Sequence, residues 1–288
     1  MKLKAVIATV SMLGLLLPAG TWAQSAPRQG QQRQGQQQGK SQQAQTPANE
    51  VRVERADTLI GMDVKSQQGE TLGEIENLMI DLKDGRVAYA VLDLDGWLDV
   101  GGKHVAAPWE ALSLKPGTEE VTLKVDKDKL RQAPSFARDY WPTAVERPWL
   151  VTVYEFYGQR PYPALTVTMV DKIDVASATA IMDMDVENRQ GESLGEVEDL
   201  AIDLENGRIA YAVLEFGGWL GLGERLAAVP WGALALNAAE REFTVDTAKD
   251  QLKTIPSFAR NDWPQTIDRK WLSEVYARYN EKPYWETK

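Results

Sequence analysis

Two pairs of long apolar runs, each pair separated by a short polar turn, dominate the hydrophobic pattern of the chain. Residues 73–82 and 86–94 are rich in Val, Ile, Leu and Tyr and flank an Asp-Gly pair at 84–85, and an Asn-Gly pair at 206–207 separates two similar runs. An Asp-Gly or Asn-Gly pair between apolar strands is the strongest short-range hairpin signal. The pattern predicts a β-hairpin with a two-residue turn at both places.

Shorter apolar segments predict further strands at 57–64, 104–107, 112–114 and 121–125. Short strands at close spacing are typical of a small barrel or sandwich, and a barrel leaves no sheet edge exposed. Residues 146–157 carry apolar side chains at helical spacing, which predicts a helix with an aromatic face that includes Trp149, and Trp271 holds the same position in a second such segment. That face either covers its own barrel, as such faces usually do, or binds a ligand or partner.

The whole pattern occurs twice. Displaced by 122 residues, the chain aligns with itself without a gap, and about half of the aligned positions are identical. GETLGEIENLMIDLKDGRVAYAVL at 69–92 falls on GESLGEVEDLAIDLENGRIAYAVL at 191–214, and PSFARDYWP at 134–142 falls on PSFARNDWP at 256–264. We therefore expect two homologous units, each of ordinary domain size.

The first residues have the order of a secretory signal peptide. Lys2 and Lys4 precede an apolar run at 5–17, and small residues at 21 and 23 suit a cleavage site after Ala23. An uncleaved anchor is the alternative, although the run is short for a span of about 20 residues. No later segment is apolar enough to cross a bilayer. We expect a periplasmic or secreted protein with no transmembrane segment after cleavage.

A Gln-rich, low-complexity segment follows the signal. It has almost no apolar side chains with which to offset the entropy of ordering, so we expect a disordered tether. Its sparse positive charge also suits contact with an anionic envelope surface. The expected order is a signal peptide at 1–23, a linker at 24–50, repeat 1 at 51–165, a linker at 166–178 and repeat 2 at 173–288.

Composition narrows the function classes. The net charge is −10, and removing the +5 of residues 1–56 leaves −15 for residues 57–288. A nucleic-acid surface needs clustered Lys and Arg, so we expect no nucleic-acid partner, whereas an acidic surface attracts cations. The absence of cysteine excludes disulfides, thiol catalysis and zinc–thiolate sites. We find no catalytic motif and expect neither an enzyme nor a cofactor.

One segment combines acids with the only histidine of the chain. DLDGWLDVGGKH at 93–104 has a counterpart, EFGGWLGLGERL at 215–226, which keeps Gly-Trp-Leu but has Gly, Gly and Leu in place of Asp95, Asp99 and His104. The spacing also fails to match a calcium-binding loop. A metal site built on these aspartates and the histidine is therefore a minor hypothesis.

The predicted register raises a second question about acids. A two-residue turn places Glu76 opposite Asp93, and Glu198 opposite Glu215 in repeat 2. Like charges directly opposed across strands are unfavourable. Three explanations stay open: a β-bulge shifts the register, the pair lies at a wet barrel rim, or a cation or basic side chain neutralises it. Under the last, a weak divalent-cation site would involve Glu76, Asp93, Asp95 and Asp99.

The Gly-Trp-Leu segments offer a contact surface. Trp97 and Trp219 lie between glycines at predicted loop tips, and exposed aromatic residues are enriched at interfaces. The alternative is that each folds over the end of its own barrel, since Trp is well buried on average. The candidate interaction residues are Trp97, Trp219, Trp149 and Trp271.

These motifs resemble the PRC-barrel family. The resemblance rests on G-M-D-V, G-E-T-L-G-E-I-E-N-L-M-I-D, D-G-R-V-A-Y-A-V-L, G-W-L and A-P-W, and on their second copies, over roughly 75–80 residues of each repeat. The family is named for the photosynthetic reaction centre H subunit, and the barrel is also similar to the C-terminal domain of a ribosome-maturation factor. The resemblance implies a mainly β chain of two tandem small β-barrels, each followed by a short aromatic-rich helical extension.

Known members act mainly through protein–protein contacts and have no general catalytic residues. The resemblance therefore implies a non-catalytic interaction or scaffold module, here exported to the bacterial cell envelope, with a protein partner that the sequence does not identify. The alternative is a periplasmic protein that binds a ligand or a divalent cation at the acidic barrel rim.

Overall fold

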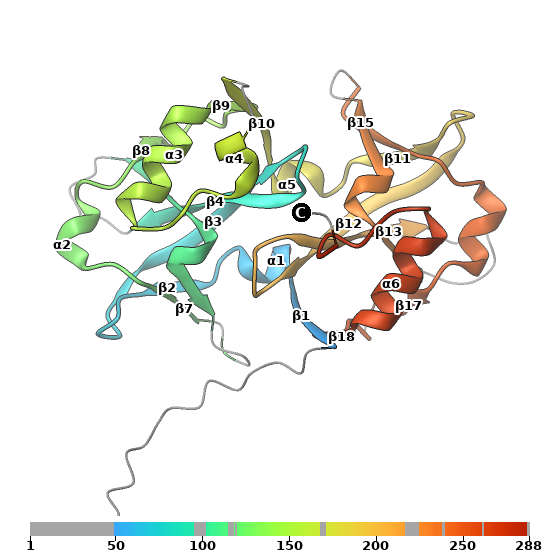
Figure 1. Ribbon diagram of the computed structural model, residues 1–288, viewed down its shortest axis with the longest axis horizontal. Coiled ribbons are helices and arrows are strands. Elements are labelled where there is room, and N and C mark those ends of the chain that lie inside the picture. Colours follow the sequence, from blue (N-terminus) through green and yellow to red (C-terminus); the bar gives the residue numbers. More distant parts are fainter. Residues whose placement is uncertain are drawn as a thin grey trace, which may run out of the picture. The chain divides into compact units, whose positions relative to one another are not determined.

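The chain forms two equivalent nine-stranded sheets, one for each repeat (Figure 1). This computed structural model describes residues 49–94, 102–114, 118, 120–167, 171–216, 225–237, 240–260 and 262–286. The mainly β class predicted from the sequence is confirmed. Along the hydrogen-bonded strands that the structure describes, neither sheet closes into a ring.

The strands of the two sheets correspond one to one. In spatial order, the first sheet contains β6 (Leu112–Leu114), β7 (Glu120–Leu123), β2 (Asp63–Lys65), β3 (Thr71–Asp81), β4 (Arg86–Leu94), β5 (Lys103–Ala107) and β8 (Ser135–Ala137), with β10 (Lys172–Ser177) on β3 and β9 (Ala144–Glu146) on β10. The second contains β15 (Leu234–Asn237), β16 (Glu242–Val245), β11 (Asp185–Asn188), β12 (Ser193–Asp203), β13 (Ile209–Phe216), β14 (Arg225–Val229) and β17 (Ser257–Phe258), with β1 (Glu50–Arg55) on β12 and β18 (Thr266–Asp268) on β1.

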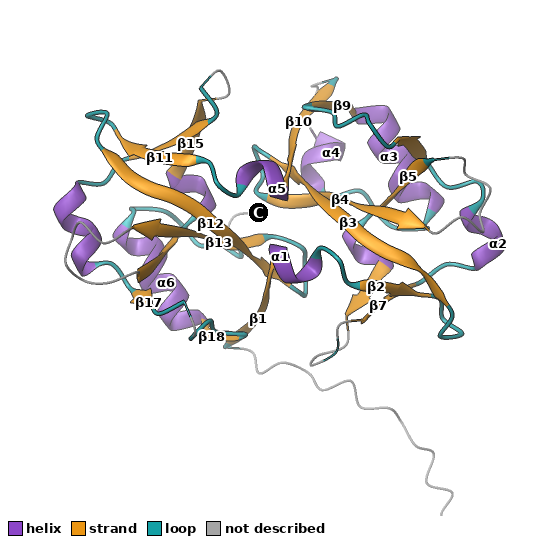
Figure 2. Cartoon of the chain, turned by 180° about the vertical axis from the view of Figure 1, so that it is seen from behind, coloured by secondary structure: helices purple, strands orange, loops and turns teal. Residues whose placement is uncertain are grey.

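The helices are short (Figure 2). They are α1 (Ala56–Leu59), α2 (Lys127–Leu130), α3 (Arg147–Phe156), α4 (Pro163–Val167), α5 (Ala178–Ile181) and α6 (Arg269–Arg278), with 3₁₀ turns η2 (Trp109–Ala111), η4 (Trp231–Ala233) and η5 (Lys249–Thr254). Helices α1 and α3 have counterparts at the equivalent places of the other repeat in α5 and α6, whereas α4 has none among the described residues. None of the helices in the described ranges is both long enough and apolar enough to cross a membrane.

The aromatic face of α3 packs on the sheet of its own repeat. Its residues Leu150, Val153 and Tyr154 are buried, and the Tyr154 hydroxyl donates a hydrogen bond of 3.2 Å to the Ala88 carbonyl of β4. In α6, the Tyr276 hydroxyl donates the matching bond to the β13 backbone. Both helices therefore cover the sheet of their own repeat, which is the role that the helical spacing of their apolar residues favoured.

The hairpins form where the sequence places them, but with a different register. The β3–β4 turn spans four residues, because Asp81 pairs with Arg86 and the Gly85 N–H donates to the Asp81 carbonyl over 2.9 Å. The register then shifts twice along the hairpin, once on each side of the segment 77–79. The prediction of a two-residue turn is thus wrong, and the cross-strand residue pairs that were derived from it differ from those observed.

The predicted strand at 57–64 is also wrong in its first half. Residues Ala56–Leu59 form α1, and only β2 at its end is extended. The Asp199 side chain of repeat 2 accepts hydrogen bonds from the N–H groups of Ala56 and Asp57, over 3.0 and 3.3 Å. A carboxylate that accepts from the first N–H groups of a helix stabilises its start, and here it comes from 142 residues away in the chain.

The first strand of each repeat pairs with the sheet of the other repeat. Strand β1 precedes repeat 1 yet pairs with β12 and β18, and β10 precedes repeat 2 yet pairs with β3 and β9. Figure 1 shows this exchange, since β1 runs beside β18 from the opposite end of the sequence. Each sheet is therefore completed by a segment that the sequence assigns to its neighbour.

The two hairpin turns meet the other repeat's tryptophan in a reciprocal contact. The Trp109 indole N–H donates to the Leu204 carbonyl over 3.4 Å, and the Trp231 indole N–H donates to the Leu82 carbonyl over 3.0 Å. A Cβ added to Gly207 would lie 2.6 Å from the Trp109 ring, and a Cβ added to Gly85 would lie 2.3 Å from the Trp231 ring. Both distances are too short for any residue with a side chain. Both glycines also have φ near +65°, so the turn needs glycine twice over.

Candidate functional site

A cluster of charged side chains lies at the equivalent place in both sheets, on interior strands and beside a β-bulge. In repeat 2 the register of β12 shifts between Val197 and Asp199, which makes Glu198 the bulged residue. A bulge leaves its extra residue unpaired and redirects its side chain. Glu198 consequently reaches the vicinity of Glu215 on β13, although the residue that pairs with Glu215 is Glu196.

One arginine bridges this acidic pair in repeat 2. The Arg260 guanidinium, just after β17, donates to both oxygens of Glu198, with 3.1 Å between Nη2 and Oε2, and also to Glu215. Burial raises the pKa of Glu198, which the bonds from Arg260 oppose, and the two glutamates together raise the pKa of the arginine. The remaining neighbour on β14 is Leu226, which pairs with Glu215 and carries no charge.

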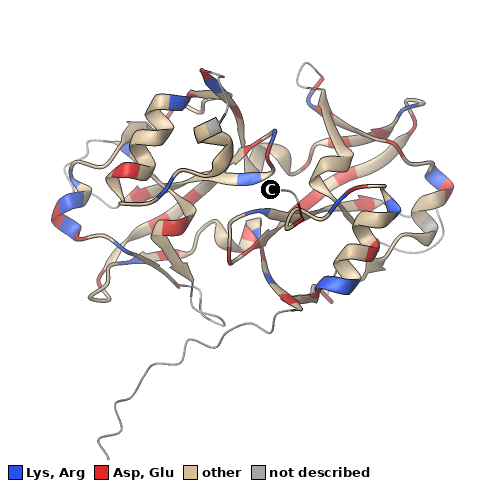
Figure 3. Cartoon of the chain, viewed as in Figure 1, with Lys and Arg blue, Asp and Glu red and all other residues tan. Residues whose placement is uncertain are grey.

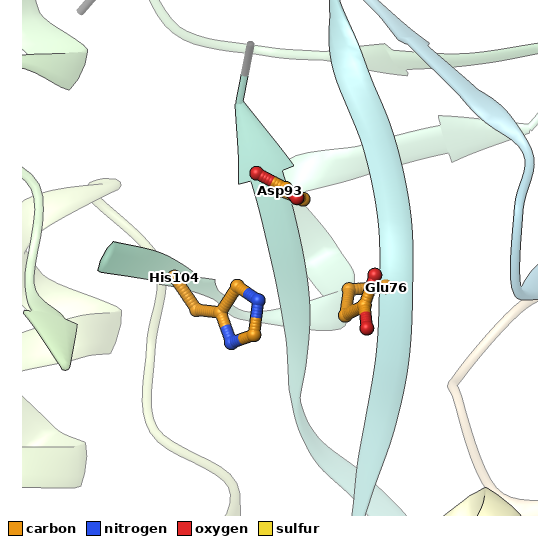
Figure 4. Close-up of side chains that lie close together, drawn as sticks. All are labelled: Glu76, Asp93 and His104. Atoms are coloured by element: carbon orange, nitrogen blue, oxygen red, sulfur yellow. The ribbon is translucent and has the colours of Figure 1, made fainter. Parts of the chain in front are cut away.

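Repeat 1 has the same two acids but divides them between two partners. Arg138, the equivalent of Arg260, donates to Asp93. Glu76 is the bulged residue of β3, and no ion pair to it occurs within the part of the chain that the structure describes. His104 takes the place of the leucine, and Figure 4 shows its imidazole turned toward Glu76.

Three adjacent strands position these side chains. Glu76 comes from β3, Asp93 from β4 and His104 from β5, and the pairing of Leu92 with Val105 brings the next residues of β4 and β5 side by side. One ligand atom from each of the three side chains lies within 4.8 Å of the others. The hairpin and the bulge thus bring together an imidazole and two carboxylates that are up to 28 residues apart in sequence.

His104 is buried, with only 3% of its surface exposed. Its ring packs against Phe136 and Trp141, with centroid distances of 5.8 and 5.3 Å. Nδ1 has no hydrogen-bond partner among the described residues. Burial lowers the pKa of His104, while Glu76 and Asp93 oppose that shift.

The structure revises what the sequence predicted for the acids. Glu76 does not stand opposite Asp93, because Glu74 does. A β-bulge does shift the register, as one of the three explanations held, but the residue that it places opposite Asp93 is again an acid. A basic side chain, another of the three, does pair with Asp93 through Arg138. Of the candidate cation-site residues, Glu76 and Asp93 lie close together, whereas Asp95 and Asp99 lie outside the described residues.

Sequence reasoning kept His104 only in a minor hypothesis and missed the two arginines. The histidine was set aside because repeat 2 has leucine at the equivalent position. A comparison of the two repeats shows that the residue differs, but not which side chains lie around it. The arginines did leave a signal, since Arg138 and Arg260 end the PSFAR motif that both copies share. Each lies 45 residues after the acid that it binds.

The candidate interaction residues have different outcomes. Trp97 and Trp219 lie outside the described residues. Trp149 and Trp271 are partly buried and meet the tyrosines of their own sheets edge to face, with centroid distances of 5.4 Å to Tyr89 and 5.9 Å to Tyr211. Their use as a contact surface stays a prediction.

Two aromatic residues that the sequence analysis did not single out are exposed. Tyr140 is 57% exposed and Trp141 is 39% exposed. In repeat 2 the equivalent of Trp141 is Trp263, and the Arg55 guanidinium lies over its ring at 4.8 Å from the centroid. Repeat 1 has Ser177 at the position of that arginine, which leaves Trp141 more exposed than the partly buried Trp263.

Trp141 also borders two surface depressions. One, of about 1030 Å³, is lined by apolar residues such as Met79 and Met184 and by the charged Lys83 and Arg241. The other, of about 650 Å³, contains Glu76 and Ile60. Trp141 therefore lies between a largely apolar groove and the acidic cluster of Glu76 and Asp93, which we call the acidic rim.

Lys and Arg positions are interspersed with Asp and Glu positions along the ribbon in Figure 3. The full sequence has 32 basic and 42 acidic residues. The expectation of no nucleic-acid partner rests on this composition and stays a prediction.

Comparison with protein families gives one match, found twice. The model of the PRC-barrel domain matches residues 52–130 and residues 173–252, once in each repeat. Comparison with curated proteins finds no match. The two matched regions together cover more than half of the chain, and both end before the aromatic helices α3 and α6.

Proposed function

Because the chain belongs to the PRC-barrel family, we propose that it is a non-catalytic, exported protein-interaction or scaffold module of the bacterial cell envelope. The observation that carries the proposal is the exposed pair Tyr140 and Trp141 beside the groove of about 1030 Å³. Tyr and Trp are the residues that most often anchor protein interfaces, and a mixed apolar and charged groove suits a peptide segment better than a small apolar ligand.

The groove supplies features that a protein partner requires. Its apolar wall is bordered by two exposed cationic side chains, Lys83 and Arg241. Such a rim gives orientation and specificity, while the aromatic residues supply the buried area. The Gly-Trp-Leu segments and the faces of Trp149 and Trp271 remain further contact candidates under this proposal.

Site-specific photo-crosslinking tests the interaction. A photoreactive phenylalanine analogue at position 140 of the exported full chain should crosslink to one reproducible protein partner, and the same analogue at Asp262, the equivalent position of repeat 2, should not. Trp141→Ala should reduce the yield by at least about tenfold, as expected for an interface anchor that contributes about 2 kcal/mol. Equal crosslinking from both positions, or none from either, would overturn the proposal.

Export is tested separately. We expect the protein in the periplasmic or secreted fraction to begin at Gln24, as N-terminal sequencing of the purified protein would report. A product that retains Met1 and sediments with membranes would identify the segment as an anchor. A full-length product in the cytoplasm would overturn the envelope location altogether.

A second candidate function is the binding of a divalent cation at the acidic rim. One specific observation favours it: the ligand atoms of Glu76, Asp93 and His104 lie within 4.8 Å of one another in repeat 1. Under this function the protein responds to an ion in the envelope, and partner binding is not required. A thermal-shift series with divalent ions and with chelator separates the two functions, because an adaptor that binds no ion keeps one unfolding midpoint throughout.

A further inference from the structure

The rim of repeat 2 shows what a self-sufficient ion-pair cluster looks like in this fold. Glu198 and Glu215 share Arg260, and the adjacent Leu226 is apolar. Every charge in that cluster has a partner of opposite sign within the chain. Both of its carboxylates are already engaged by the same guanidinium.

The rim of repeat 1 is built differently at two positions. Arg138 pairs with Asp93 only, so that one arginine no longer serves both acids. His104 replaces the leucine and adds a lone-pair donor directed at Glu76. No hydrogen bond joins the imidazole to either carboxylate among the described residues, although all three lie within 4.8 Å. The three groups converge without satisfying one another.

The chemistry of these groups selects a class of ion. Imidazole suits zinc, copper, nickel and related first-row metals, and carboxylate oxygens complete such sites. Calcium and magnesium prefer oxygen ligands alone. The Asp93 oxygen that accepts from Arg138 leaves the second carboxylate oxygen available, because a carboxylate has about four lone-pair sites. Three protein ligands around one ion leave a fourth position for water or for a partner's side chain.

Burial and access both suit an ion at this place. His104 is buried, and its ring packs against Phe136 and Trp141. Glu76 lines the depression of about 650 Å³, which gives an ion a route to the cluster from solvent. Metal sites need such a fixed ligand on one side and an entry path on the other.

We propose that Glu76, Asp93 and His104 bind one divalent transition-metal ion of the zinc class at the rim of repeat 1, and that repeat 2 binds none. The proposal rests on the second candidate function and names its ligands and its ion. It replaces the all-carboxylate set expected from the sequence with a set that contains the single histidine. Repeat 2 serves as a control within the same molecule.

The test uses the tag-free full chain, freed of metal with a chelator and titrated with Zn²⁺ in a calorimeter. We expect binding of one equivalent. Because the chain has a single histidine, its ¹H–¹⁵N spectrum contains one imidazole, whose ring nitrogens should shift until one equivalent of zinc is added. Unchanged imidazole signals at one equivalent of bound zinc would overturn the proposal.

Matched variants identify the ligands. His104→Leu installs the residue that repeat 2 tolerates at Leu226, and it should weaken zinc binding by more than about 100-fold, since loss of even an outer partner costs 10–100-fold. Glu76→Gln should also weaken binding strongly, and its side chain is partly exposed, which keeps the test valid if the histidine variant does not fold. Glu198→Gln, the equivalent change in repeat 2, should leave the affinity unchanged.

The other outcomes are equally decisive. Arg138→Gln removes the cation that competes for Asp93, and it should tighten zinc binding. If the protein binds calcium, and this binding persists in His104→Leu but is lost in Glu76→Gln, the rim binds cations through carboxylates alone. The second candidate function then stands, and the proposed site with an imidazole ligand is wrong. If neither ion binds up to millimolar concentration, both fail.

Discussion

The two repeats carry the same acidic pair beside the same β-bulge, but each balances it in its own way. In repeat 2 one arginine holds both glutamates, and in repeat 1 the arginine holds Asp93 while Glu76 faces His104. The backbone that brings the acids together is identical in register. A duplicated fold therefore preserves the problem of opposed charges, and each copy solves it with different side chains.

The bulges show a second difference of the same kind. The residue after the bulged glutamate is Asn77 in repeat 1 and Asp199 in repeat 2. Asn77 bonds to Thr179 at the start of α5, with 2.8 Å between Nδ2 and Oγ1. Asp199 accepts from Arg55 over 2.9 Å and from the N–H groups at the start of α1. One junction is neutral and the other is a buried ion pair.

Removing the buried carboxylate should have the largest effect on stability. Asp199→Ala leaves the α1 N–H groups and Arg55 without their acceptor, which should cost about 3–5 kcal/mol of unfolding free energy. Asn77→Ala removes neutral bonds only and should cost about 1–2 kcal/mol. Urea denaturation of both variants measures the gap. Equal losses would show that the charge adds nothing to the junction.

The covered and the open tryptophan should differ next. Trp263→Ala removes a ring that packs on Phe258 and lies under Arg55, and should cost about 3 kcal/mol. Trp141→Ala removes a ring that is 39% exposed and should cost about 1 kcal/mol. Thermal unfolding of the two variants ranks them. A costlier Trp141→Ala would mean that its cover over His104 matters more to folding than its exposure suggests.

The two rim arginines should show a smaller, salt-dependent difference. Arg260→Gln leaves two glutamates facing each other and should destabilise the protein by about 1 kcal/mol, whereas Arg138→Gln should cost about 0.5 kcal/mol because only one acid loses its partner. Both losses should shrink at 1 M salt, where the screening length is about 3 Å. A loss that is independent of salt would indicate packing by the arginine stem instead of charge.

The smallest expected effect is the pH dependence that Asp199 confers. Burial raises the pKa of this carboxyl, against the opposing bond from Arg55. A carboxyl with a raised pKa stabilises the fold most when it is protonated, and that contribution is lost as the pH rises through the folded-state pKa. The stability of the wild type relative to Asp199→Asn should therefore fall from acid toward neutral pH. Urea denaturation across that range checks the sign, and an advantage that grows with pH would contradict it.

Local pattern was enough to predict much of the fold, but not the contacts that cross between the repeats. The hairpin arms, the later strands and the aromatic helices follow from periodicity and turn residues. The helix at Ala56–Leu59 does not, because its start is stabilised by Asp199 from the other repeat. The exchange of β1 and β10 could not be predicted either, because the residues of a strand do not indicate which distant strand it pairs with.

At the candidate site, the two acids could be predicted from the sequence, but the side chains around them could not. The predicted register failed because a four-residue turn and two bulges displaced it, and each of these depends on backbone geometry more than on residue type. His104 was undervalued because a substitution between copies looks like drift until burial and proximity are known. The sequence comparison nevertheless identified Glu76 and Asp93 as a pair that needs an explanation.

The exchanged strands also determine when the molecule is complete. Strand β1 near the start of the chain pairs with β18 near its end, so the second sheet cannot be finished until almost the whole chain has been made. Contacts so distant in sequence slow folding, because the loop that joins them must close first. Until then β1 presents a free edge, which is a template for association with other chains. An incomplete chain, whether nascent or truncated, is thus expected to aggregate more readily than the complete one. A chaperone that bound the unpaired edge of β1 would prevent this.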